Sequence, residues 1–166
     1  MVLAVDVYYH DDLSAKVVGV LFNWKDREAK FVYDDLVSQV SEYVPGQFYK
    51  RELPCILQLL NTVDLGTISC VIVDGHVYVD NQKTYGLGGH LWKALQEKIP
   101  IIGIAKKAFF GTENVSFPVL RGQSKTPLFV SSIGIEVAEV MDKVEQMHGK
   151  YRIPTLLKYL DQQTRL

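Results

Sequence analysis

Three acidic residues, Asp6, Glu52 and Asp74, stand where an α/β protein could use them for chemistry. Asp6 interrupts an apolar N-terminal run, Asp74 directly follows a second apolar run, and Glu52 opens an apolar helical pattern. The functional crevice of an open α/β sheet lies at the carboxyl ends of its central strands. If the first strand and strand 68–73 are neighbours, Asp6 and Asp74 meet there, and Glu52 can reach them from a facing helix.

Clustered carboxylates repel one another unless a divalent cation neutralises them. No matching set of His or Cys accompanies these acids, so the donors favour magnesium or manganese over zinc. Such a cluster suits phosphodiester hydrolysis. Each acid also has a simpler interpretation, because Asp74 can form a turn and Glu52 can favour a helix start. A charge such as Asp6 inside an apolar strand costs stability unless it is paired or faces water.

The elements that must position these acids follow from hydrophobic periodicity. Residues 1–9, 15–23 and 29–35 predict three strands joined by polar loops, an antiparallel start. Helical stripes and further strands then follow. The stripes fall at residues 53–60, 87–95, 137–144 and 156–160, and the strands at 68–73, 99–104, 115–120 and 127–132. This order predicts an α/β fold with a mixed sheet and helices on its faces.

The length of 166 residues predicts a single domain, 1–166, and the 48% of hydrophobic residues argues against disorder. A net charge of -1 argues weakly against a nonspecific nucleic-acid coat, yet it allows an enzyme with a local basic groove. Cys55 and Cys70 lack a CxxC partner and are expected to be buried free thiols.

No apolar stretch approaches the ~20 residues that span a bilayer, and no secretory signal pattern opens the chain. We therefore expect a cytoplasmic monomer without a membrane partner.

Seven short segments resemble, in order, the motifs of the endonuclease V family. The most specific is 43–54, which is similar to that family's YxPG…FRExP segment. The others are 5–7 (first acidic motif), 73–76 (DG), 86–91 (GxASHLG), 100–107 (PxIGVAK), 127–131 (PxYVS) and 151–154 (YRxPEP).

The resemblance implies a ribonuclease H-like fold and a magnesium-dependent endonuclease of DNA repair. Such an enzyme cuts nucleic acid on the 3′ side of a deaminated base such as inosine, one phosphodiester bond beyond it. By the same resemblance, Asp6, Glu52 and Asp74 would hold the metal, Mg²⁺ or Mn²⁺, and Lys106 would face the phosphate. Without the motif, Lys106 would be interpreted as a surface lysine.

The resemblance also implies a rigid turn that enters the duplex and a pocket for the extruded base, which a lesion makes easier to flip. The wedge would be Tyr43, Val44 and Pro45, and the pocket would be lined by the backbone of Gly46, Phe48, Gly75 and Leu87. Glycines let the main chain approach a planar ligand closely. Apart from the family, the Pro-Gly pair is an ordinary turn.

The sequence departs from the family pattern at several points. The histidine that usually follows the PxYVS strand is missing from 131–135, and residues 78–83 replace the family's HPR element. His76 or Asp80 could partly substitute, whereas His90 matches a family histidine that could simply be a packed side chain. The PEP element has also changed, and the family's N-terminal helix and most of its C-terminal tail are not expected.

These departures leave two alternatives to an active DNA endonuclease. One is a catalytically impaired nucleic-acid-binding module. The other is a nuclease of the same fold that acts on RNA or branched structures.

Overall fold

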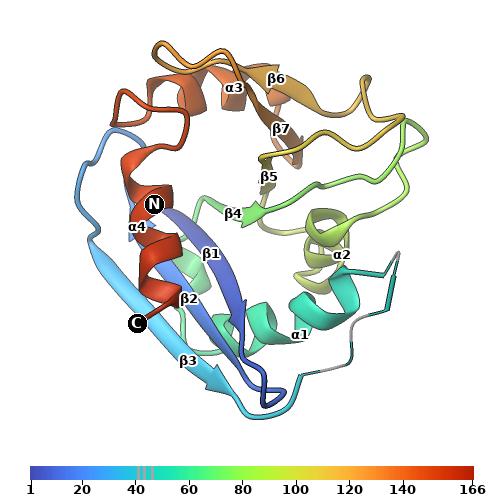
Figure 1. Ribbon diagram of the computed structural model, residues 1–166, viewed down its shortest axis with the longest axis vertical. Helices are drawn as coiled ribbons and strands as arrows, with labels where there is room; N and C mark the ends of the chain where they lie inside the picture. The colour runs from blue at the N-terminus through green and yellow to red at the C-terminus, as the bar shows by residue number, and fades with distance from the viewer. Residues whose placement is uncertain (41, 43, 46) are drawn as a thin grey trace.

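The computed structural model describes residues 1–40, 42, 44–45 and 47–166, and these form a seven-stranded sheet with helices packed on it (Figure 1). The strands are β1 (Val2–Tyr9), β2 (Ala15–Phe22), β3 (Phe31–Val37), β4 (Cys70–Asp74), β5 (Ile101–Ala105), β6 (Phe117–Val119) and β7 (Leu128–Ile133). The helices are α1 (Tyr49–Leu60), the short 3₁₀ helix η1 (Leu65–Thr67), α2 (Leu87–Ala94), α3 (Val137–Gln146) and α4 (Thr155–Thr164).

The strand order is β3-β2-β1-β4-β5-β7-β6. β1, β2 and β3 pair antiparallel, which confirms the predicted start, whereas β4 lies parallel to both β1 and β5. β7 returns antiparallel to β5 and carries β6 at the sheet edge. The predicted mixed α/β sheet is therefore confirmed. β6 is shorter than the predicted strand 115–120, and it contains Pro118, which has no N–H to donate to a ladder.

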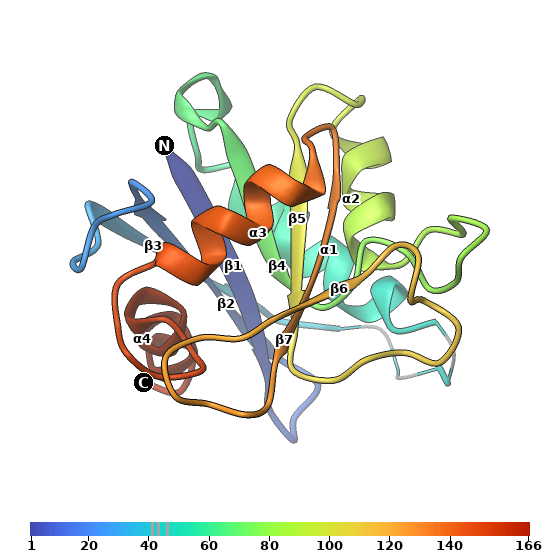
Figure 2. The same ribbon diagram turned by 90° about the horizontal axis from the view of Figure 1, so that it is seen from above.

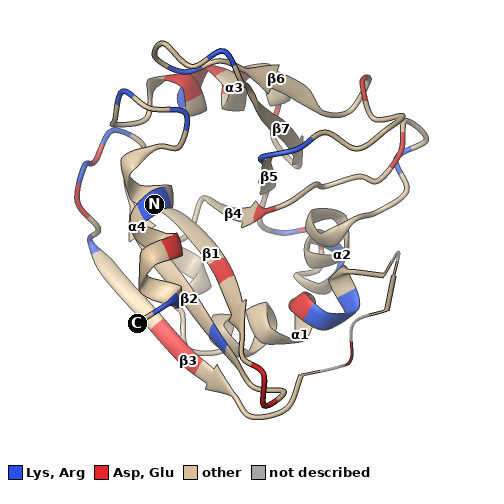
Figure 3. Ribbon diagram, in the orientation of Figure 1, with Lys and Arg blue, Asp and Glu red and all other residues tan. Residues whose placement is uncertain are grey.

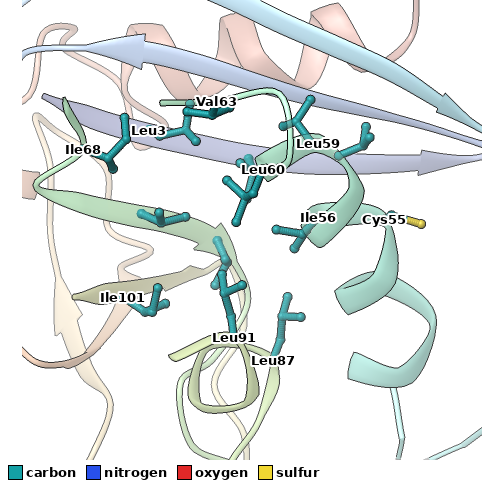
Figure 4. Packing of buried hydrophobic residues seen from close by; sticks show 14 of the residues in the cluster. Leu3, Cys55, Ile56, Leu59, Leu60, Val63, Ile68, Leu87, Leu91 and Ile101 are labelled. Carbon is teal, nitrogen blue, oxygen red and sulfur yellow. The ribbon is translucent and has the colours of Figure 1, made fainter. Parts of the chain in front are cut away.

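Alternating side chains along the strands build two cores, one on each face of the sheet. On one face, Leu3 packs with Ile56 of α1 and Leu91 of α2 (Figure 4). On the other face, Ala4 belongs to a cluster with Leu160 of α4 and residues of α3. Figure 2 shows α3 crossing the sheet on the side opposite α1 and α2. The carboxyl ends of β1, β4 and β5 thus lie between two helical layers.

Cys55 and Cys70 are both buried and free, as predicted. Within the part of the chain that the structure describes, no helix is both long and apolar enough to cross a membrane.

Candidate active site

Asp6 and Asp74 lie side by side at the carboxyl ends of adjacent parallel strands. Val5 of β1 is opposite Val73 of β4, so the next pair in register is Asp6 and Asp74. Ala4 and Ile72, two residues before each acid, belong to the core under α3 and α4, so both acids project toward that face. They line the same hollow, of about 180 Å³. The structure therefore brings these two predicted residues together.

Three more charged residues line this hollow, namely Lys106, Lys158 and Asp161. Lys106 directly follows β5, and Asp161 comes from α4. Sequence reasoning missed Asp161, although one signal was available: it stands one helical turn after Leu157, on a stripe that faces the sheet. Asp161 Oδ1 also lies 3.5 Å from Nη2 of Arg165. Figure 3 marks the charged positions on β1, β4 and α4 around this region.

Glu52 reaches the site from the opposite face of the sheet. It lies in the first turn of α1 and shares a second, larger pocket with Asp74. Asp74 thus borders both the hollow and the pocket. Among residues 1–40, 42, 44–45 and 47–166, no three His, Cys, Asp or Glu side chains are close enough together to hold a metal ion. The three predicted acids are close enough to affect one another's protonation, but they do not form a closed set of metal ligands.

The protonation of these acids reflects burial and mutual repulsion. Burial, followed by the negative charges of Asp6 and Asp74, raises the pKa of Glu52 to about 8. Burial and the charge of Asp74 raise the pKa of Asp6 to about 7, although Val7 N–H donates to its carboxylate at 2.9 Å. The pKa of Asp74 is also raised by desolvation, against the charge of Lys106, although its side chain still reaches solvent. Ionised together, these oxygen donors are a chemically suitable set for a hard divalent cation.

The second pocket contains the base-pocket residues that the structure describes. It has a volume of about 480 Å³, and its walls include Phe48, Gly75, Leu87 and Phe109. Gly75 has a φ of +146°, a conformation that other residues rarely adopt, and this lets the main chain leave Asp74 sharply. Sequence reasoning missed Phe109. Gly46 lies outside the described residues.

His76 and His90 line this pocket and not the acidic hollow. The ring of His76 is buried and stacks on Phe109 with centroids 4.1 Å apart, and its Nε2 lies 2.9 Å from the carbonyl oxygen of Lys107. His90 stacks on Tyr49 at 3.7 Å. Burial lowers the pKa of both imidazoles, so both are neutral near pH 7. Their positions fit a role as pocket walls.

Two arginines, Arg152 and Arg121, hold the main chain through hydrogen bonds to carbonyl oxygens. Arg152, within the 151–154 motif, donates through Nη2 to the carbonyl oxygens of Lys106 and of Pro127, the latter at 2.8 Å. Arg121 is 2% exposed and donates to carbonyl oxygens in the last turn of α3 and in the segment that follows it. Its acceptors belong to Val144, Met147, Gly149, Tyr151 and Arg152. Arg121 was not predicted.

The predicted wedge is described in part. Val44 and Pro45 are exposed just before α1, as a surface that enters a duplex must be, and Tyr43 lies outside the described residues.

The family model for endonuclease V matches residues 1–162. Endonuclease V of Xylella fastidiosa is 33% identical over 108 residues, which are 64% of this chain and 43% of the relative. The match thus spans less than half of that relative's length.

Solved structures show the same fold. Endonuclease V from Streptomyces avermitilis superposes with a TM-score of 0.80 at 25% identity, covering 99% of this chain and 79% of its own. Human ENDOV gives 0.78 at 25% identity, covering 99% and 82%. The Ciona intestinalis enzyme, solved with a 24mer DNA containing an inosine, gives 0.81 at 20% identity, covering 99% and 83%. The predicted ribonuclease H-like fold, which these structures share, is thereby confirmed, and the chain belongs to the endonuclease V family.

Proposed function

We propose that this chain is a metal-dependent endonuclease of DNA repair that hydrolyses a phosphodiester bond on the 3′ side of a deaminated base such as inosine. The observation that carries the proposal is the position of Asp74, at the border between a hollow lined by five charged residues and a pocket with apolar walls. The reaction centre and the pocket that recognises the base would therefore meet at Asp74. Membership of the endonuclease V family supports the same assignment.

Asp6, Glu52 and Asp74 would hold the metal, with Asp161 as a further carboxylate in the hollow. Magnesium or manganese bound there would supply charge neutralisation and activation of water. The raised pKa values of Asp6 and Glu52 fit this role, because a cation favours the ionised form of acids that otherwise repel one another. The hollow thus contains a further polar group, the Asp161 carboxylate, although this chain lacks the histidine that is usual in the family.

Lys106 would orient the scissile phosphate, since it lines the hollow beside Asp6 and Asp74. Its main chain is held by Arg152, so the ammonium group starts from a fixed backbone position. An ammonium opposite the acids compensates the charge of a phosphate that approaches them.

The second pocket would receive the extruded base. Phe48, Leu87 and Phe109 offer apolar surface for a planar ring, and Gly75 brings the main chain close to its edge. Tyr43, Val44 and Pro45 would keep the duplex open. Because Asp74 touches both cavities, a base bound in the pocket would place its own strand across the acidic hollow.

One observation favours the impaired binding module as a second candidate. The described acids do not form a closed metal cage, so cleavage depends on whether a cation can draw them together.

A substrate panel tests these candidates. Labelled DNA with one inosine, the matching RNA, a branched junction and undamaged DNA would each be incubated with Mg²⁺ or Mn²⁺. We expect cutting of the inosine DNA one bond beyond the lesion, with undamaged DNA intact. Preferential cutting of RNA or of the junction would replace the proposed substrate. Binding of inosine DNA without cutting would support the binding module.

A further inference from the structure

Arg51, in the first turn of α1, has an unusual environment for a cation. Its guanidinium carbon lies 3.7 Å from the centroid of the Tyr9 ring, at the end of β1. A guanidinium stacked on an aromatic ring is restricted to one plane, so its terminal N–H groups have a fixed direction. The next residue along the helix is Glu52, which borders the candidate active site.

Among the described residues, the Arg51 guanidinium has no recorded acceptor for its side-chain donors. Its Nε is buried and has no hydrogen-bond partner in the described part of the chain. The ion pairs formed among the described residues join Lys30 to Asp26 and Arg165 to Asp161, and neither includes Arg51. Buried N–H donors are almost always paired, because an unpaired one loses its hydration without compensation. The guanidinium, which forms no ion pair among the described residues, is therefore available to an anion that arrives from outside.

Arg51 does not act as a counter-ion of its neighbour Glu52. The ion pairs among the described residues do not join these two side chains. The Arg51 guanidinium lies over the Tyr9 ring instead.

We infer that Arg51, oriented by Tyr9, binds a backbone phosphate of the nucleic acid beside the candidate active site. The inference rests on the proposed function, because it places nucleic acid across the carboxyl edge of the sheet. A planar guanidinium can donate two parallel hydrogen bonds to one phosphate, which gives direction as well as charge neutralisation. The exposed Lys50 adds positive charge to the same helical turn.

The salt dependence of binding isolates a phosphate contact. Fluorescence anisotropy would measure the Kd for an inosine duplex in EDTA, which prevents cutting, at a series of KCl concentrations. Each neutralised phosphate contributes about 0.9 to the slope of log K against log salt. We expect Arg51→Ala to lower the slope by about 0.9 and to weaken binding roughly tenfold at low salt.

Two further variants define the geometry. Arg51→Lys is expected to keep the slope but to bind several-fold more weakly, because it retains the charge and loses the paired donors. Tyr9→Leu removes the stacking ring and is expected to weaken binding without a change in slope. Lys98→Ala, an exposed lysine between α2 and β5, is the matched control and is expected to behave as wild type.

The outcomes separate this inference from the proposed function. If wild type cuts inosine DNA and Arg51→Ala has the wild-type slope, the phosphate contact is wrong and the proposed function stands. If wild type cuts none of the panel substrates but the slope falls in Arg51→Ala, the contact stands and the proposed activity is wrong. Circular dichroism of each variant confirms that it is folded.

Discussion

Replacing Glu52 with Gln tests the electrostatics of the site without any substrate. In the unfolded chain Glu52 titrates near its ordinary pKa of 4.5, and in the folded protein near 8. Between these two pH values the folded state keeps a proton that the unfolded state releases. Wild type therefore loses stability as the pH rises through this window, and the loss is complete above pH 8.

The size of the loss follows from the shift in pKa. One pKa unit corresponds to about 1.4 kcal/mol, so full ionisation of Glu52 lowers the free energy of unfolding by an amount on the order of 5 kcal/mol. Glutamine has a similar shape and carries no charge at either pH. The free energy of unfolding of Glu52→Gln should therefore exceed that of wild type by less than about 1 kcal/mol at pH 5 and by roughly 5 kcal/mol at pH 9.

Urea unfolding at pH 5 and pH 9, in EDTA, measures this difference. Glu139→Gln is the matched control, since Glu139 also lies in the first turn of a helix but is exposed. Its effect should be small and equal at both pH values. If Glu52→Gln shows the same difference from wild type at pH 5 and pH 9, or is the less stable protein at pH 9, the Glu52 carboxylate is not desolvated beside other acids and the reasoning fails.

Three further predictions concern the surroundings of the site. Arg152→Ala should lower kcat about tenfold through misplacement of Lys106 and should have no further effect in a Lys106→Ala background; additive losses would show that it acts elsewhere. Arg121→Met should lower the free energy of urea unfolding by about 3 kcal/mol or more, because five main-chain carbonyls lose their donor; a change below about 1 kcal/mol would contradict this. Tyr43→Ala should weaken binding to an inosine in duplex DNA more than in single-stranded DNA, and an equal loss on both would refute the wedge.

The fold was predictable from local patterns because the sheet is buried on both faces. β4 and β5 are short runs of apolar residues, and the antiparallel start carries its own loop signals. The order of the strands was harder to predict, because no sequence pattern indicates that β7 pairs antiparallel with β5.

The site was predictable where a strand fixes the position of an acid. Asp6 and Asp74 end neighbouring strands, so adjacency in the sheet brings them together. Asp161 was not predicted because a polar residue on a terminal helix also suits a solvated face, and only the packing of α4 directs it to the hollow. Arg121 was missed for a related reason: its acceptors are carbonyls more than 20 residues away, which leave no sequence pattern.

Cutting at a single inosine tests most directly whether the acids at the carboxyl edge of the sheet form a nuclease centre. Wild type, Asp74→Ala and the exposed control Asp11→Ala would be incubated with a labelled inosine duplex and Mg²⁺ or Mn²⁺, and the product ends would be mapped. We expect a nick one bond beyond the inosine with wild type and Asp11→Ala, and none with folded Asp74→Ala. Normal cutting by Asp74→Ala, or no cutting by folded wild type with either metal, would contradict it.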